Sequence, residues 1–118
     1  QIERELREAL QRDLIRPRFR PSIDLASGRV TALEAVPSWV EAGKERFPPE
    51  RFLPVAEETG LIHELAGRVL AIACAAARDW PDDIVLSVDI LPAQLKNRTL
   101  SDGVLATLRG AGLPAARL

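Results

Sequence analysis

The segment IVLSVDI at residues 84–90 constrains the fold more than any other part of the sequence. It is apolar on both faces apart from Ser87 and Asp89, and strands of this kind lie in parallel sheets that helices cover. The preceding residues, 62–80, have the spacing of an amphipathic helix, with small residues that would let it lie close to a sheet. The sequence therefore predicts an α/β fold.

Two short strands are predicted closer to the N-terminus. Residues 18–24 alternate in polarity, a turn with Gly28 follows, and residues 30–36 form an apolar run, which together are typical of an antiparallel β-hairpin. Pro21 has no N–H for the ladder, so its strand is expected at a sheet edge or beside a bulge. Three predicted strands cannot close a barrel, and such an apolar sheet is expected to have further neighbours.

The other predicted elements are four helices and one loop. Apolar residues four positions apart predict the first helix, and Gly60 in a left-handed conformation is expected to end the second. Ser101 is expected to be the N-cap of the last helix. The predicted helices cover residues 1–14, 49–58, 92–95 and 101–111, with a polar surface loop over residues 40–49.

The composition excludes several classes of protein. Of the 118 residues, 47% are hydrophobic and 28% are charged, as in a folded globular domain rather than a disordered segment. The net charge of -1 gives no electrostatic reason to expect a nucleic-acid polymer or an anionic membrane surface as a partner. No apolar run approaches the length of about 18 residues that a membrane span requires.

The single cysteine and the absence of methionine bear on where the chain comes from. Cys74 alone cannot form an internal disulfide and fits a reducing compartment, so a cytoplasmic location is predicted, in a parent protein that could itself be membrane-tethered. Without a methionine, Gln1 is not expected to be the first translated residue, and the chain is expected to be part of a longer protein. Cys74, Trp39 and Trp80 are all expected to be core residues.

Four stretches of the sequence stand out, namely PSIDLASGRV at residues 21–30, LEAVPSW at 33–39, FLPVAEETGLI at 52–62 and VLSVDI at 85–90. Together they resemble the EAL family, the cyclic di-GMP phosphodiesterases of bacterial signalling. The resemblance implies part of a modified TIM (β/α)8 barrel whose first strand is antiparallel to the others. Residues 15–118 would then be the N-terminal half of the domain, and residues 1–14 a connector helix from an upstream signalling domain.

The resemblance implies two metal-binding positions, Glu34 and Asp89. Glu34 matches a glutamate ligand of the family, and Asp89 stands where the family has an asparagine ligand. Mg²⁺ or Mn²⁺ is expected in an active member, because hard cations prefer carboxylate oxygens and two ions can orient the attacking water. From the residues alone, a solvated or paired glutamate at a strand end is favoured for Glu34, and Asp89 could equally be the cap of a helix that begins after Pro92.

Two further family positions, both substrate-binding, are substituted. Ser38 stands where the family has an arginine that grips a phosphate, and serine cannot supply a bidentate cation. Arg20 stands where the family has a glutamine that helps to hold the nucleotide. It could compensate for Ser38 from another direction, or be an exposed surface arginine. The other acids of the family site and its lysine are expected beyond this chain, so no catalytic residue is assigned.

Three classes of function follow from this pattern. The chain could belong to an active phosphodiesterase whose other half lies outside it, to a receptor that binds cyclic di-GMP without cleaving it, or to a degenerate domain that acts through protein contacts. The substitutions at Arg20, Ser38 and Asp89 favour an inactive regulatory module, and the loss of the arginine favours protein contacts. Self-association is also expected, because a part-barrel leaves strand edges and apolar surface uncovered.

Overall fold

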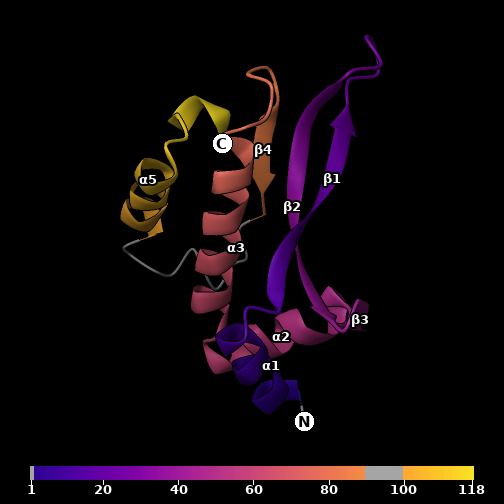
Figure 1. The fold of residues 1–118 in the computed structure, drawn as a ribbon, viewed down its shortest axis with the longest axis vertical. Helices are drawn as coiled ribbons and strands as arrows, with labels where there is room; N and C mark the ends of the chain where they lie inside the picture. The colour runs from indigo at the N-terminus through magenta and orange to yellow at the C-terminus, as the bar shows by residue number, and fades with distance from the viewer. Residues whose placement is uncertain (1, 90–99) are drawn as a thin grey trace.

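The computed structural model describes residues 2–89 and 100–118. It forms a four-stranded sheet with helices packed along it (Figure 1). The elements in chain order are α1 (Ile2–Gln11), β1 (Ile15–Ile23), β2 (Val30–Glu41), β3 (Lys44–Phe47), α2 (Pro49–Thr59), α3 (Ile62–Ala77), β4 (Val85–Val88), α5 (Leu100–Ala111) and the short 3₁₀ helix η1 (Ala115–Arg117).

Strand β2 organises the sheet, since the other three strands all pair with it. β1 is antiparallel to β2 along most of its length, whereas β4 is parallel to it, with Leu33 opposite Leu86. These pairings confirm both the predicted hairpin and the predicted parallel strand. Pro21 lies in β1, which pairs with β2 alone among the described strands, and the register shifts just after it, between Ser22 and Ile23.

The predicted surface loop at residues 40–49 is wrong. β2 continues to Glu41, and β3 returns beside it as a second, short hairpin. Ala42 and Gly43 make the turn with φ of 54° and 79°, the two positive values that a type I′ turn requires. Phe47 then packs on Trp39 with 5.1 Å between ring centroids, and this tertiary contact favours a strand where the local sequence is polar.

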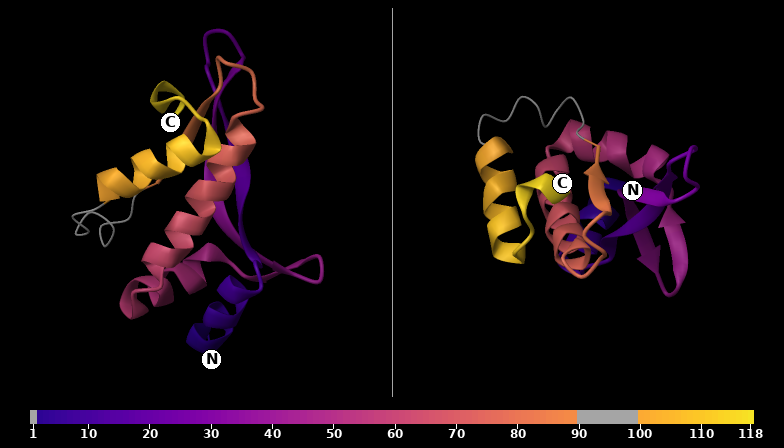
Figure 2. Two further views of the ribbon diagram at one scale, coloured as in Figure 1. Left: turned by 60° about the vertical axis from the view of Figure 1, so that its left-hand side comes forward. Right: turned by 90° about the horizontal axis from the view of Figure 1, so that it is seen from above.

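The core lies between α3 and the sheet. α3 contacts β1, β2 and β4, and α5 packs on α3 away from the sheet (Figure 2). Cys74 on α3 is fully buried, as predicted, and burial raises the pKa of its thiol. Trp39 is also buried, as predicted, whereas Trp80 is only partly buried and packs edge-on against Phe19.

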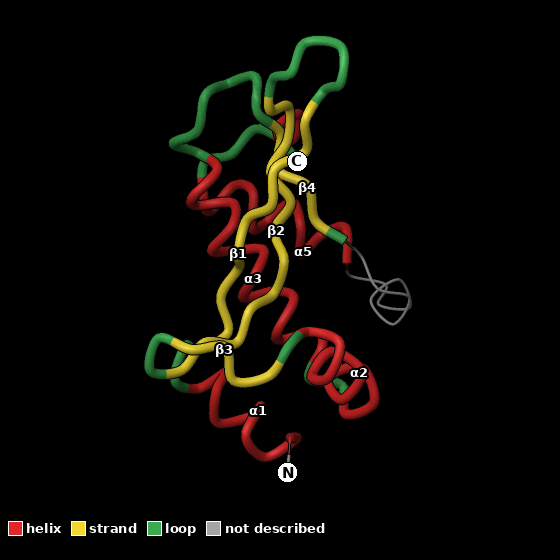
Figure 3. Tube along the Cα trace, turned by 90° about the vertical axis from the view of Figure 1, so that its right-hand side faces the viewer, coloured by secondary structure: helices red, strands yellow, loops and turns green. Residues whose placement is uncertain are grey.

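A second packing region lies at one end of the sheet. α1, α2 and β3 gather there (Figure 3), and α1 buries Leu6, Ala9 and Leu10. The helix ends at Gln11 rather than at residue 14, because Asp13 takes a positive φ of 59° and redirects the chain into β1.

The remaining helix boundaries agree closely with the predictions. Gly60 has φ of 81° and ends α2, as expected. α3 ends at Ala77, three residues short of the predicted range, and α5 begins at Leu100, so Ser101 lies inside the helix rather than at its N-cap. The predicted short helix at residues 92–95 lies outside the described residues, and η1 was not predicted.

Arg117 fixes the last turn of the chain to the rest of the fold. Its side chain is 11% exposed. It donates to the carbonyl oxygens of Ile84 (3.0 Å), Ala77 (3.1 Å) and Pro81 (3.1 Å). These acceptors lie at the end of α3 and in the segment that leads to β4, so one side chain connects η1 to both elements.

Candidate functional site

The site begins with a cross-strand pair on β1 and β2. Arg20 and Glu34 are directly opposite each other in the antiparallel ladder. The guanidinium donates to Oε1 of Glu34 from Nη2 at 2.8 Å and from Nε at 3.2 Å. This ion pair holds the pKa of Glu34 below its ordinary value and raises the pKa of Arg20. The structure thus shows Glu34 as a paired glutamate, and its role as a metal ligand stays a prediction.

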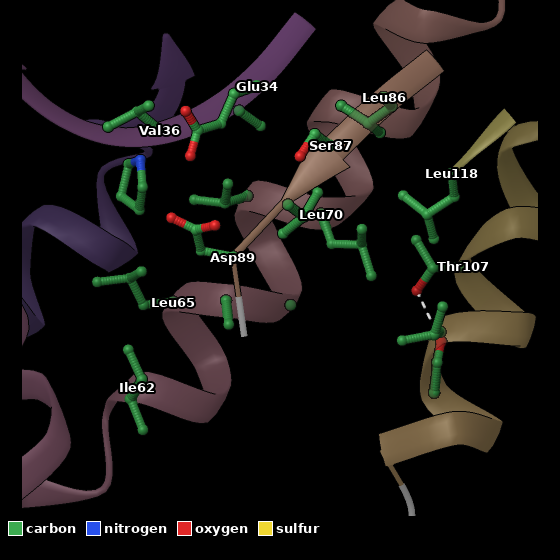
Figure 4. A pocket seen from close by; sticks show the side chains of 18 of the residues that line it. Glu34, Val36, Ile62, Leu65, Leu70, Leu86, Ser87, Asp89, Thr107 and Leu118 are labelled. Atoms are coloured by element: carbon green, nitrogen blue, oxygen red, sulfur yellow. Dashed lines mark hydrogen bonds between the residues drawn. The ribbon is translucent and has the colours of Figure 1, made fainter. Parts of the chain in front are cut away.

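Asp89 joins this pair from the other side of β2. Glu34 lies opposite Ser87 in the parallel ladder, and Asp89 follows directly after the end of β4. The carboxyl groups of Glu34 and Asp89 face each other (Figure 4). Hydrogen bonding to Glu34, followed by its negative charge, raises the pKa of Asp89, so that Asp89 is the more readily protonated of the two.

The three charged side chains line one part of a large cavity of about 1040 Å³ between β2, β4, α3 and α5. Most of its other lining groups are apolar, as Figure 4 shows for Leu65, Leu70 and Leu86. The three charged side chains are thus gathered on one side of a largely hydrophobic space, which is a common arrangement for a site that binds an organic ligand.

Ser38 is the predicted site residue that the structure does not bring to this cavity. It lies opposite Arg16 in the ladder and is not among the residues that line the cavity. Arg20, Glu34 and Asp89 come together, and Arg20 is an exposed arginine with a defined partner. The helix that Asp89 was alternatively expected to cap lies outside the described residues.

Three polar residues of the cavity, Ser87, His63 and Thr107, were not predicted as site residues. Ser87 lies opposite Glu34 and lines the cavity, and its signal was present in the sequence as a polar residue inside an otherwise apolar strand. His63 also lines the cavity but is exposed on α3, and no sequence pattern distinguishes it from a surface histidine.

The described residues do not by themselves fit a divalent metal ion. Among residues 2–89 and 100–118, no three His, Cys, Asp or Glu side chains are grouped so that they could hold one. Glu34 and Asp89 offer two carboxyl groups, and Glu34 already has a guanidinium as its counter-ion. Mg²⁺ needs near-octahedral oxygen coordination, which two carboxylates supply only with further ligands.

Within the described part of the chain, no helix has both the length and the apolar character needed to cross a bilayer.

An antiparallel hairpin, a parallel strand and a covering helix, with an acidic pair on the sheet, make the chain part of a mixed α/β domain. The sequence matches the EAL domain over residues 3–118, and the chain belongs to this family. The family and the partial barrel predicted from the sequence are therefore confirmed.

Curated relatives are similar to the chain along its whole length. The cyclic di-GMP phosphodiesterase NbdA of Pseudomonas aeruginosa is 34% identical over 122 residues, which cover 100% of this chain and 16% of that protein. An uncharacterized signaling protein of Caulobacter vibrioides is 35% identical over 117 residues, which cover 99% of this chain and 14% of that protein. The chain thus spans a small part of the length of these relatives.

Solved structures of EAL-domain proteins are also similar to the chain. The PaMucR phosphodiesterase in complex with c-di-GMP superposes with a TM-score of 0.91 at 30% identity, over 99% of this chain and 49% of that chain. The FimX EAL domain from Pseudomonas aeruginosa, bound to c-di-GMP, superposes with a TM-score of 0.82 at 26% identity, over 96% of this chain and 46% of that chain. The chain therefore spans about half of these solved chains.

Proposed function

We propose that this chain is the N-terminal half of a cyclic di-GMP signalling domain that does not hydrolyse the nucleotide and acts in regulation through protein contacts. The observation that carries the proposal is the composition of the site. Glu34 and Asp89 are the carboxylates that the described residues bring to it, and Ser38 supplies no cation to a phosphate.

The chemistry of phosphodiester hydrolysis explains why this set of residues is insufficient. Metal-assisted hydrolysis needs several oxygen ligands, a group that handles the proton of the attacking water, and positive charge on the phosphate. Loss of a single electrostatic contact of this kind costs about a hundredfold or more in rate. In the family, Mg²⁺ or Mn²⁺ supplies the metal part of this chemistry, and here the clamp position holds Ser38.

The two parts of the chain would have different roles. Residues 1–14 would connect the domain to an upstream signalling domain, and residues 15–118 would be half of the barrel. The amphipathic helix α1 supports this assignment, since it buries one face and keeps exposed charge on the other. A cytoplasmic location would give such a domain access to a soluble nucleotide second messenger.

A hydrolysis assay tests the proposal. The purified chain is incubated with cyclic di-GMP and Mg²⁺ or Mn²⁺, and chromatography follows the nucleotide, which is expected to remain intact. Metal-dependent formation of the linear dinucleotide that Glu34→Ala abolishes would overturn the proposal. Glu58→Ala is a matched control, because Glu58 is exposed on α2 and does not line the cavity.

A second candidate function is a receptor that binds cyclic di-GMP without cleaving it. Two observations favour it, namely the similarity to PaMucR and FimX domains in complex with this nucleotide and the arginine that lines the cavity. Calorimetry with cyclic di-GMP in the absence of metal separates the candidates, because a receptor binds and a pure protein-contact module does not. Hydrolysis by the complete parent protein would show that the missing half of the site restores a phosphodiesterase.

A further inference from the structure

Arg20 places a permanent positive charge beside the acidic pair of the site. A guanidinium stays protonated at any physiological pH, and the antiparallel ladder sets the backbone of position 20 directly opposite Glu34. The pairing of the two strands thus fixes the separation of the two backbones and leaves the side chains of Arg20 and Glu34 within reach of each other. The position of this cation is therefore set by the pairing of two strands and not by a flexible loop.

The geometry of the contact explains how Arg20 acts on Glu34. Both nitrogen donors, Nε and Nη2, bond to the same carboxylate oxygen, Oε1. This arrangement leaves Oε2 without a bond to Arg20 and still places the guanidinium charge within hydrogen-bond distance of Glu34. Asp89 also feels this charge, since Arg20 acts to lower the pKa of Asp89 while Glu34 acts to raise it.

The net charge of the site with Arg20 differs by one unit from that of a site with a neutral residue at position 20. Glu34 and Asp89 ionised together carry a double negative charge, and Arg20 reduces it to a single one. A divalent ion that used oxygens of both carboxylates would lie close to the guanidinium and be repelled by it. The family resemblance places a neutral glutamine at this position, and such a residue would exert no repulsion of this kind.

On the basis of the function proposed above, we propose that Arg20 is the resident counter-ion of Glu34 and Asp89 and that it excludes divalent metal ions from them. Position 20 then determines whether this carboxylate pair takes a metal ion. Because the side chain of Arg20 is 68% exposed and that of Glu34 is 23% exposed, Arg20 acts through charge and hydrogen bonding rather than by filling the site.

Metal binding measured without nucleotide tests this role. Binding of MnCl₂ is followed by electron paramagnetic resonance for the wild-type protein, Arg20→Gln and Arg18→Gln. Arg18 is the matched control, since it is exposed on the same strand and lies opposite the apolar Val36. Arg20→Gln is expected to bind Mn²⁺ about tenfold more tightly than wild type, by loss of a nearby like charge. Arg18→Gln is expected to match wild type.

Two further variants locate the effect. Arg20→Lys keeps the charge without the guanidinium fork, and is expected to bind Mn²⁺ as weakly as wild type. The double variant Arg20→Gln/Glu34→Gln is expected to lose the gain in affinity. The proposal is overturned if Arg20→Gln binds like wild type, if Arg18→Gln gains as much, or if the double variant keeps the gain.

NMR of the arginine side chains in the wild-type protein tests the ion pair without any variant. The Nε proton of Arg20, held by Glu34, is expected to exchange with water more slowly than that of Arg18 in NMR spectra. Equal exchange rates would overturn the proposed counter-ion. Because no nucleotide is present in these experiments, a negative result leaves the hydrolysis assay to decide the proposed function separately.

Discussion

Glu34 and Asp89 lie face to face because β4 is parallel to β2 in a register that sets Glu34 opposite Ser87. Side chains alternate along a strand, so Asp89, two residues beyond Ser87, is expected to project to the same side of the sheet. A shift of one residue in this pairing would turn the two carboxyl groups to opposite faces. The acidic pair is therefore a consequence of one strand pairing between distant parts of the chain.

Replacing Arg20 is expected to raise the pKa of Glu34. The bond from Arg20 is the largest cause of the lowered pKa of this carboxyl. Carbon-13 NMR of the side-chain carboxyl groups, recorded against pH, should show Glu34 titrating at higher pH in Arg20→Gln than in wild type. A group with a lowered pKa stabilises the fold above its ordinary pKa and loses that contribution as pH falls through the lowered value, so acid should remove less stability from the variant. An unchanged titration of Glu34 would contradict the ion pair.

Replacing Asp89 by asparagine is expected to raise thermal stability at pH 7. The pKa of Asp89 is raised by its interaction with Glu34, so the ionised form is disfavoured in the folded state. Ionised Asp89 therefore lowers the free energy of unfolding. This loss grows as pH rises from the ordinary aspartate range through the raised pKa, and it disappears when Asp89 is protonated.

Thermal melts of wild type and Asp89→Asn between pH 7 and pH 4 measure this effect. The difference in Tm should shrink as pH falls, because protonation makes the wild type resemble the variant. Asp79→Asn serves as the control, since Asp79 is largely exposed and does not line the cavity. A Tm difference for Asp89→Asn that is independent of pH would count against the carboxyl pair.

Alanine is expected to have opposite effects at two glycines. Gly60 has φ of 81°, so Gly60→Ala should lower the free energy of unfolding by about 1 kcal/mol through backbone strain. Gly67 lies inside α3, so Gly67→Ala should raise it by about 0.5–1 kcal/mol. Neither added Cβ would meet an atom within 4 Å, which leaves the backbone as the cause. Urea denaturation compares the two, and equal effects would be inconsistent with the left-handed cap.

Removing the side chain of Arg117 is expected to destabilise the fold. Arg117→Ala leaves the carbonyl oxygens of Ala77, Pro81 and Ile84 without this donor, at an expected cost of about 1–3 kcal/mol in the free energy of unfolding. Arg109→Ala on the exposed side of α5 should change stability by less than about 0.5 kcal/mol. Equal urea midpoints for the two variants would show that Arg117 does not anchor the C-terminal turn.

The chain is expected to self-associate when it is purified alone. Within the described residues, β1 and β4 each pair with β2 only, and the apolar cavity beside β4 is open to further packing. Leu25 at the hairpin tip is 98% exposed and Ile23 is 54% exposed, which adds apolar surface. Light scattering at micromolar concentration should report a species larger than a monomer. A monomer that binds no dye specific for exposed apolar surface would refute this expectation.

Local sequence by itself determined the hairpin at Gly28, the end of α2 at Gly60 and the apolar strand that Ser87 interrupts. Each depends on the conformational preferences of a few neighbouring residues, and the structure places each as predicted. The resemblance to the EAL family also indicated Arg20, Glu34, Asp89 and Ser38, and the structure brings the first three of these together at the cavity.

Tertiary structure alone decided which of these residues meet. β3 formed because Phe47 packs on Trp39, a contact that the polar sequence around it does not predict. The ion pair of Arg20 with Glu34 depends on the register of β1 against β2. The approach of Asp89 depends on the parallel pairing of β2 with β4, two strands that α2 and α3 separate in the sequence. Hydrophobic burial against α3 sets both registers, and burial is a property of the assembled sheet rather than of any local segment.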